Sequence, residues 1–160
     1  MTMTDAWYDL LSCAHYLGYH TVDAMSYEFD EAQPFTLVTS NKKEAEEIRQ
    51  TLGGPPRAAV WVIEGRHGSK GVTYLLREVF HPTTVRLADG QDAPGARKKF
   101  HYRLEGQGTE FGEAFDLQRF GWFPAFLADN GNFGFGLRVL RDQDVKDVFI
   151  ELARPFYEKA

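Results

Sequence analysis

Residues 111–136 constrain the fold most, because this segment carries eight aromatic residues and five glycines in 26 positions. Aromatic side chains bring a large apolar area with a rigid shape, and glycines let a backbone turn tightly or approach a neighbour closely. Such a combination builds either a dense β core or a recognition surface. The two alternatives lead to different functions.

The length and charge of the chain limit the classes of protein to consider. A chain of 160 residues is long enough for one domain with its own core. A hydrophobic content of 43% and a charged content of 26% are ordinary for a globular protein. The net charge of −5 argues against nucleic-acid binding, which needs clustered lysines and arginines. We therefore predict a single domain over residues 1–160 that binds no nucleic acid.

Cysteine usage and apolar runs bear on the compartment. Cys13 is the only cysteine, so no disulfide can form within the chain. The first residues include an early Asp5 and no basic stretch before an apolar one, which is not typical of a signal peptide. No apolar run approaches the roughly 18 residues that a membrane span needs. We expect a cytoplasmic protein that does not bind a membrane.

Apolar spacing predicts three helices. Residues 5–17 repeat apolar side chains at helical intervals, and Gly18 is well placed to end that helix. Residues 41–53 begin with a box-like cap and carry a thin apolar stripe, which is typical of a surface helix. A strong stripe follows Asp142 and indicates a C-terminal helix, whose last turn Pro155 weakens.

The segments between these helices resemble strands. Apolar runs or alternating patterns occur at residues 21–29, 34–40, 57–64, 72–80, 83–88, 99–106 and 113–120. Residues 122–140 are typical of a hairpin that turns at Asn130-Gly131. The sequence therefore predicts an α+β fold with a mostly antiparallel sheet of about six to nine strands. The N-terminal, C-terminal and surface helices are expected on one face of that sheet.

Glu113 is the first candidate for catalysis. On a regular strand it shares a face with Phe111, and a carboxyl group among aromatic rings is desolvated and has a raised pKa. Such a group can act as a general acid or base, with His101 or His81 as its partner. The alternative is a bulge at Gly112, which would turn Glu113 to water.

Other chemical motifs are weak. The five histidines lack the HxxxH or HxH spacing of a metal site, so we predict no metal. We also predict no cofactor, since no phosphate-binding loop or nucleophile elbow is present. The basic run at residues 97–99, with His101 and Arg103 beyond it, is either a solvated surface or a small anion-binding patch.

The aromatic hairpin is the main candidate for binding. Gly134 and Gly136 alternate, so one side of that strand is bare, and a flat ligand, another chain or a core side chain could cover it. The predicted ligand or partner contacts are Trp122, Phe123, Phe126, Phe133, Gly134, Phe135 and Gly136.

Two functions remain open at this point. The first is a small binding module for a protein partner or a small organic ligand, whose acidity suits a basic partner, as in inhibitor or immunity proteins. The second is a small enzyme that uses Glu113 with a histidine in an aromatic-lined cavity for hydrolysis, isomerisation or group transfer. We favour the binding module because no set of residues supplies both a reactive group and its activator.

Overall fold

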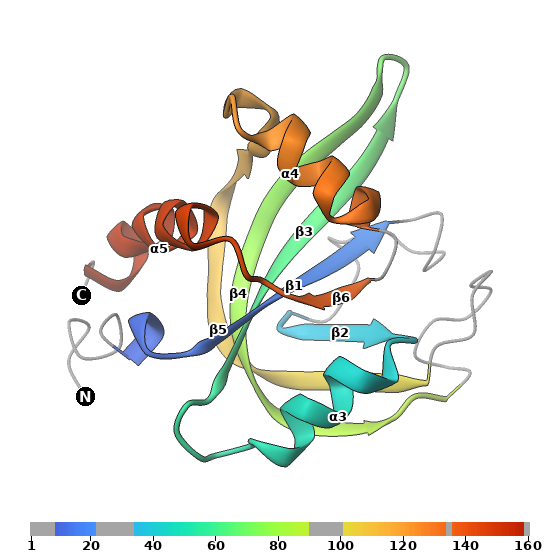
Figure 1. The fold of residues 1–160 in the computed structure, drawn as a ribbon, viewed down its shortest axis with the longest axis vertical. Helices are drawn as coiled ribbons and strands as arrows, with labels where there is room; N and C mark the ends of the chain where they lie inside the picture. Colours follow the sequence, from blue (N-terminus) through green and yellow to red (C-terminus); the bar gives the residue numbers. More distant parts are fainter. Residues whose placement is uncertain (1–8, 22–33, 90–100, 134–135, 159–160) are drawn as a thin grey trace.

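The computed structural model describes residues 9–21, 34–89, 101–133 and 136–158, and it has an α+β fold (Figure 1). The elements in chain order are β1 (Ala14–Thr21), β2 (Thr36–Thr39), α3 (Lys42–Gln50), β3 (Ala58–Gly68), β4 (Gly71–Leu87), β5 (Tyr102–Asp116), the 3₁₀ turn η2 (Leu117–Arg119), α4 (Phe123–Asp129), the 3₁₀ turn η3 (Gly131–Phe133), β6 (Leu137–Val139) and α5 (Gln143–Glu158). The predicted α+β class is confirmed.

The described strands form one six-stranded mixed sheet in the order β2-β5-β4-β3-β1-β6. β1 and β3 pair in parallel, and the other neighbours are antiparallel. The sheet curls, so its two edge strands β2 and β6 lie close together (Figure 1). Asn41 Nδ2, just after β2, donates a hydrogen bond to Leu137 O of β6 at 2.7 Å. The curled sheet is thus closed by a side chain rather than by a strand ladder.

Both faces of the sheet are buried. Ala59, Trp61 and Ile63 of β3 belong to the core cluster that α4 and α5 cover. Ala58, Val60 and Val62 belong to a second cluster, which includes Ala45 and Ile48 of α3. Because β3 is buried on both faces, its sequence is a continuous apolar run. The helices lie on both faces, which corrects the expectation of one.

Two glycines make the bend of β4 and β5 possible. These strands are 17 and 15 residues long, and Gly106 and Gly108 of β5 face the backbone of β4. A Cβ atom at Gly108 would overlap Val79 O, and one at Gly106 would overlap His81 O. Only a residue without a side chain allows this approach.

The prediction of a helix over residues 5–17 is wrong for the residues after Leu11. Residues 9–11 are helical, but Ala14–Thr21 is β1, and residues 1–8 lie outside the described part. β1 lies between β3 and β6 and is buried on both faces. A strand that is buried on both faces carries apolar residues at most of its positions. Some of these apolar positions then fall at helical intervals by coincidence.

The hairpin predicted at residues 122–140 is also wrong. Phe123–Asp129 is α4, with Pro124 in its first turn, where a missing N–H group costs nothing. Asn130 caps the C-terminus of α4, so Asn130-Gly131 ends a helix instead of joining two strands. Of this segment only Leu137–Val139 is a strand, and it pairs with β1.

The remaining strand predictions hold in part. The runs at 72–80 and 83–88 are one strand, β4, with a register shift just after Pro82. Of the runs at 99–106 and 113–120, residues 102–106 and 113–116 lie in β5, whereas Leu117–Arg119 is the 3₁₀ turn η2. Most of the run at 21–29 and all of residues 90–100, including the basic run, lie outside the described residues.

The two remaining helix predictions are confirmed by α3 and α5. Asn41 is the N-cap residue of α3, but its side chain makes no capping hydrogen bond; its Nδ2 instead donates to Leu137 O. None of the helices in the described part of the chain is long and apolar enough to cross a membrane.

Gly108→Ala tests the bend. We expect it to lower the free energy of unfolding by about 3 kcal/mol or more, because the added methyl group meets backbone atoms that cannot move aside. Gly112→Ala is the matched control on the same strand, since nothing lies within 4 Å of its added Cβ. Urea denaturation measures both. Equal stability of the two variants would contradict the role of Gly108.

Candidate functional site

A hollow lies between β6 and the start of α3. It has a volume of about 450 Å³. It is lined by Asn41, Lys43, Glu44, Arg138, Val139 and Arg141. We call this hollow the β6–α3 groove. Three cationic side chains and one carboxylate surround it.

A second hollow, of about 190 Å³, lies on the other side of β6, toward α4 and α5. Its lining residues are Phe126, Asp129, Asn130, Arg138, Val139, Arg141 and Asp142. The two hollows share both arginines, but here two carboxylates balance them. An anion therefore finds an excess of positive charge only on the α3 side.

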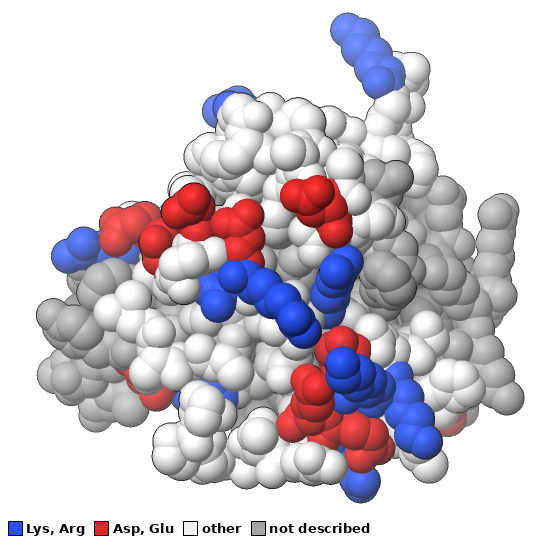
Figure 2. Space-filling view, viewed as in Figure 1, with Lys and Arg blue, Asp and Glu red and all other residues white. Residues whose placement is uncertain are grey.

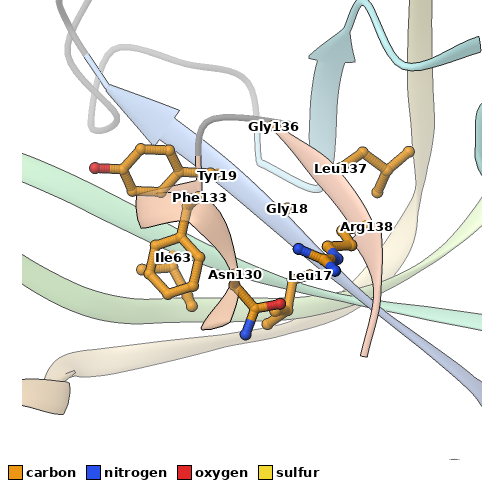
Figure 3. Close-up of a pocket in the computed structure, with 9 residues that line it drawn as sticks. All are labelled: Leu17, Gly18, Tyr19, Ile63, Asn130, Phe133, Gly136, Leu137 and Arg138. Atoms are coloured by element: carbon orange, nitrogen blue, oxygen red, sulfur yellow. The ribbon is translucent and has the colours of Figure 1, made fainter. Parts of the chain in front are cut away.

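A narrow apolar slot reaches under Arg138 (Figure 3). Its lining includes Leu17, Ile63, Phe133 and Leu137, and Asn130, Tyr19, Gly18 and Gly136 complete it. The slot leaves about 10 Å³ for the centre of a water molecule, which is room for about one water. The space for a ligand is thus in the hollows beside β6.

The cations of the β6–α3 groove differ in their contacts. Arg138 donates from Nη1 to Asp129 O at 3.5 Å. Lys43 and Arg141 make no ion pair or side-chain hydrogen bond within the described ranges. Asp142 accepts from Val145 N at 3.2 Å and so caps α5. Figure 2 shows lysine and arginine side chains on this face between groups of acidic ones.

The aromatic residues predicted to bind a partner are mostly core. Phe123, Phe126 and Phe133 are at most 5% exposed. Trp122 is half-buried and stacks on Phe120, with ring centroids 5.2 Å apart. Of the predicted set, Phe126, Phe133 and Gly136 line the hollow or the slot, whereas residues 134–135 lie outside the described residues.

The structure does not bring the predicted catalytic residues together. Glu113 is exposed, at a register shift where four residues of β5 lie opposite Arg77. His101 is exposed just before β5. His81 is buried and lies opposite Gln107 of β5. Gln107 is six residues from both His101 and Glu113 along that strand, so His81 lies roughly 20 Å from each of them.

Two buried carboxyl groups were missed by the sequence analysis. Glu64 and Glu78 are 2% and 1% exposed. Burial, with Glu110 opposite, raises the pKa of Glu78 to about 8, against the effect of a hydrogen bond from the backbone of Phe35. Glu64 pairs with Arg77 at 3.6 Å. Both glutamates lie within or next to apolar runs, which is the signal that could have identified them.

A cysteine and a histidine meet near the start of β1. Cys13 Sγ lies 3.9 Å from His81 Nδ1, but this nitrogen lies 3.0 Å from Ala58 O, to which it is suited to donate. Burial, followed by the effect of Asp9, raises the pKa of the Cys13 thiol to about 11. The thiol is therefore protonated at neutral pH and is not an activated nucleophile.

His15, a second buried histidine, has a structural role. His15 Nδ1 accepts a hydrogen bond from Trp61 Nε1 at 2.9 Å, and burial lowers the pKa of His15 to about 4. It is neutral at pH 7 and completes the core around Trp61. Across the described residues, no group of three or more histidine, cysteine, aspartate or glutamate side chains is arranged to hold a metal ion.

Thiol labelling tests the state of Cys13. At pH 8 we expect iodoacetamide to modify the native protein roughly 100-fold more slowly than the urea-unfolded protein, because the raised pKa reduces the thiolate fraction. Mass spectrometry over time gives both rates. Equal rates would contradict the raised pKa of Cys13, and faster labelling of the native protein would show an activated thiol.

Comparison with known proteins adds no family. No protein-family model matches the chain, and no curated protein matches it.

Proposed function

We propose that the protein is a binding module that holds a small organic anion in the β6–α3 groove. The observation that carries this proposal is the set of Lys43, Arg138 and Arg141 around a hollow that contains one carboxylate. A guanidinium group offers planar donors that match a carboxylate or phosphate in two-point contacts. Two such groups three residues apart can hold one acidic ligand from two directions.

The size of the groove supports a small ligand. Its volume of about 450 Å³ lies within the range of about 300 to 1,000 Å³ that is usual for small-molecule sites. A nucleic acid is disfavoured because the whole chain has a net charge of −5 and would repel a long polyanion. A short anion meets only the local excess of positive charge.

The positions of the lining residues suggest how the ligand lies. Its acidic group would lie between Arg138 and Arg141, and its body would cover Val139, which is half-buried between them. Glu44, on the wall opposite β6, would repel the acidic groups of the ligand and so direct them toward the arginines of β6.

This proposal keeps the binding class predicted from sequence but moves its location. The aromatic residues of α4 serve as core, while the cations of β6 and α3 provide the contacts. An enzyme built on Glu113, His101 and His81 is not proposed, because His81 lies roughly 20 Å from each of the other two, and those two lie still farther apart along β5.

Calorimetric titration with citrate at low ionic strength tests the proposal. We expect binding that weakens with added salt and that Arg141→Gln reduces about three- to tenfold, as for one partly exposed ion pair. Arg154→Gln is the matched control, since it removes an equal charge from an exposed arginine of α5 outside the groove. The proposal fails if citrate does not bind at millimolar concentration, or if both variants lose affinity equally.

A further inference from the structure

The hollow of about 190 Å³ between β6, α4 and α5, which we call the α4-side hollow, is lined by opposite charges that do not pair with each other. Arg138 and Arg141 line it together with Asp129 and Asp142. Within the part of the chain that the structure describes, neither aspartate makes an ion pair with either arginine. Such groups form ion pairs when they lie within about 4 Å of each other. The charges therefore stand apart across a space that a ligand with two charges would fill.

Three side chains of the α4-side hollow offer oxygen atoms to a donor. Among the described residues, no group donates a hydrogen bond to the Asp129 carboxylate. Asp142 accepts from Val145 N with Oδ1 at 3.2 Å, which leaves its Oδ2. The Asn130 side-chain nitrogen donates to Phe126 O at 2.9 Å, which leaves its Oδ1. A primary ammonium group carries three N–H donors, so its donor count matches these three side chains.

The position of Asp129 in its helix does not favour a carboxylate. Asp129 is the last residue of α4 and is exposed, and no basic residue lies in that turn. The C-terminal end of a helix carries a partial negative charge, so an acidic side chain there is destabilising. Arg138 Nη1 contacts the backbone oxygen of Asp129, at 3.5 Å, rather than its carboxylate. A cationic group of a ligand would compensate this charge.

The α4-side hollow and the β6–α3 groove share Arg138, Val139 and Arg141 in their linings, so one ligand can reach both. We propose that this ligand is a zwitterion, with a carboxylate at one end of a short aliphatic chain and an ammonium group at the other. Arg138 and Arg141 hold the carboxylate, and the chain covers Val139. Asp129 and Asp142 hold the ammonium group in the α4-side hollow. This inference rests on the proposed function, because it uses the same arginines, and it adds the second charge of the ligand.

The width of β6 sets a minimum length for the ligand. Its charged ends lie on opposite sides of one strand, and a strand takes up about 5 Å across a sheet. The ammonium and carboxylate groups of an α-amino acid are attached to the same carbon and lie closer together than this. An ω-amino acid carries the two groups at opposite ends of its chain and can span β6. The probe is therefore ε-aminocaproate, and caproate is the matched acid without the ammonium group.

NMR titration of the full chain with ε-aminocaproate and with caproate tests the inference at low ionic strength, where exposed charges are least screened. We expect ε-aminocaproate to bind about three- to tenfold more tightly, because its ammonium group gains two partly exposed charge pairs. Both ligands should shift the backbone amide signals of residues 138–141, and only ε-aminocaproate should shift those of residues 129–130. Equal affinity of the two ligands would overturn the zwitterion.

Asp129→Asn should act differently on two ligands. It should weaken the binding of ε-aminocaproate about two- to fivefold, as for one partly exposed charge pair. The affinity for citrate should stay unchanged or rise, because the variant removes a negative charge near the bound anion. Asp147→Asn, an exposed residue of α5 outside both hollows, is the matched control and should change neither affinity. If Asp129→Asn does not fold, Asp142→Asn, which can still cap α5, should give the same pattern. A loss of affinity for both ligands would overturn the inference.

Titrations with citrate and hexylamine separate this inference from the proposed function. If citrate binds and ε-aminocaproate binds no better than caproate, the zwitterion is refuted and the proposed function stands. If citrate does not bind while hexylamine and ε-aminocaproate bind equally, the arginines hold no ligand, and both the proposed function and the zwitterion fail. If Arg141→Gln and Asp129→Asn each weaken the binding of ε-aminocaproate, both ends of the ligand are held as proposed.

Discussion

The close contact of β4 with β5 at Gly106 and Gly108 is the constraint on which the other features depend. Side chains at these two positions would hold the strands apart, and the long strands could not bend as they do. The bend curls the sheet, so that β2 approaches β6 and both faces are covered, one by α3 and the other by α4 and α5. The groove beside β6 is a product of this curl.

The curl also separates two kinds of ionisable group. Glu78 lies inside, where the low dielectric makes the neutral acid the stable form. Lys43 and Arg141 lie at the rim of the β6–α3 groove, where water solvates their side chains. The rim groups can meet a ligand without the cost of desolvating an isolated charge.

The parts of the fold with one dominant pattern could be predicted from sequence. The helices α3 and α5 have clear apolar stripes, and β3 is a continuous apolar run. β1 could not be identified, because burial on both faces conceals the period of two. Glu78 was missed because a register shift between Leu76 and Glu78 changes which side chains share a face. The groove joins β6 to α3, which are far apart in sequence, so no local motif indicates it.

The way in which the sheet closes also affects its behaviour toward other chains. Exposed edge strands are templates for pairing with further copies, which leads to aggregation. Here the edges are only four and three residues long, in β2 and β6. The Asn41 amide occupies the outward carbonyl of Leu137, and Arg138 places a charge on β6. The seam between the edges thus blocks growth of the sheet from either side, and any opening of β2 would expose two edges that could recruit a second copy.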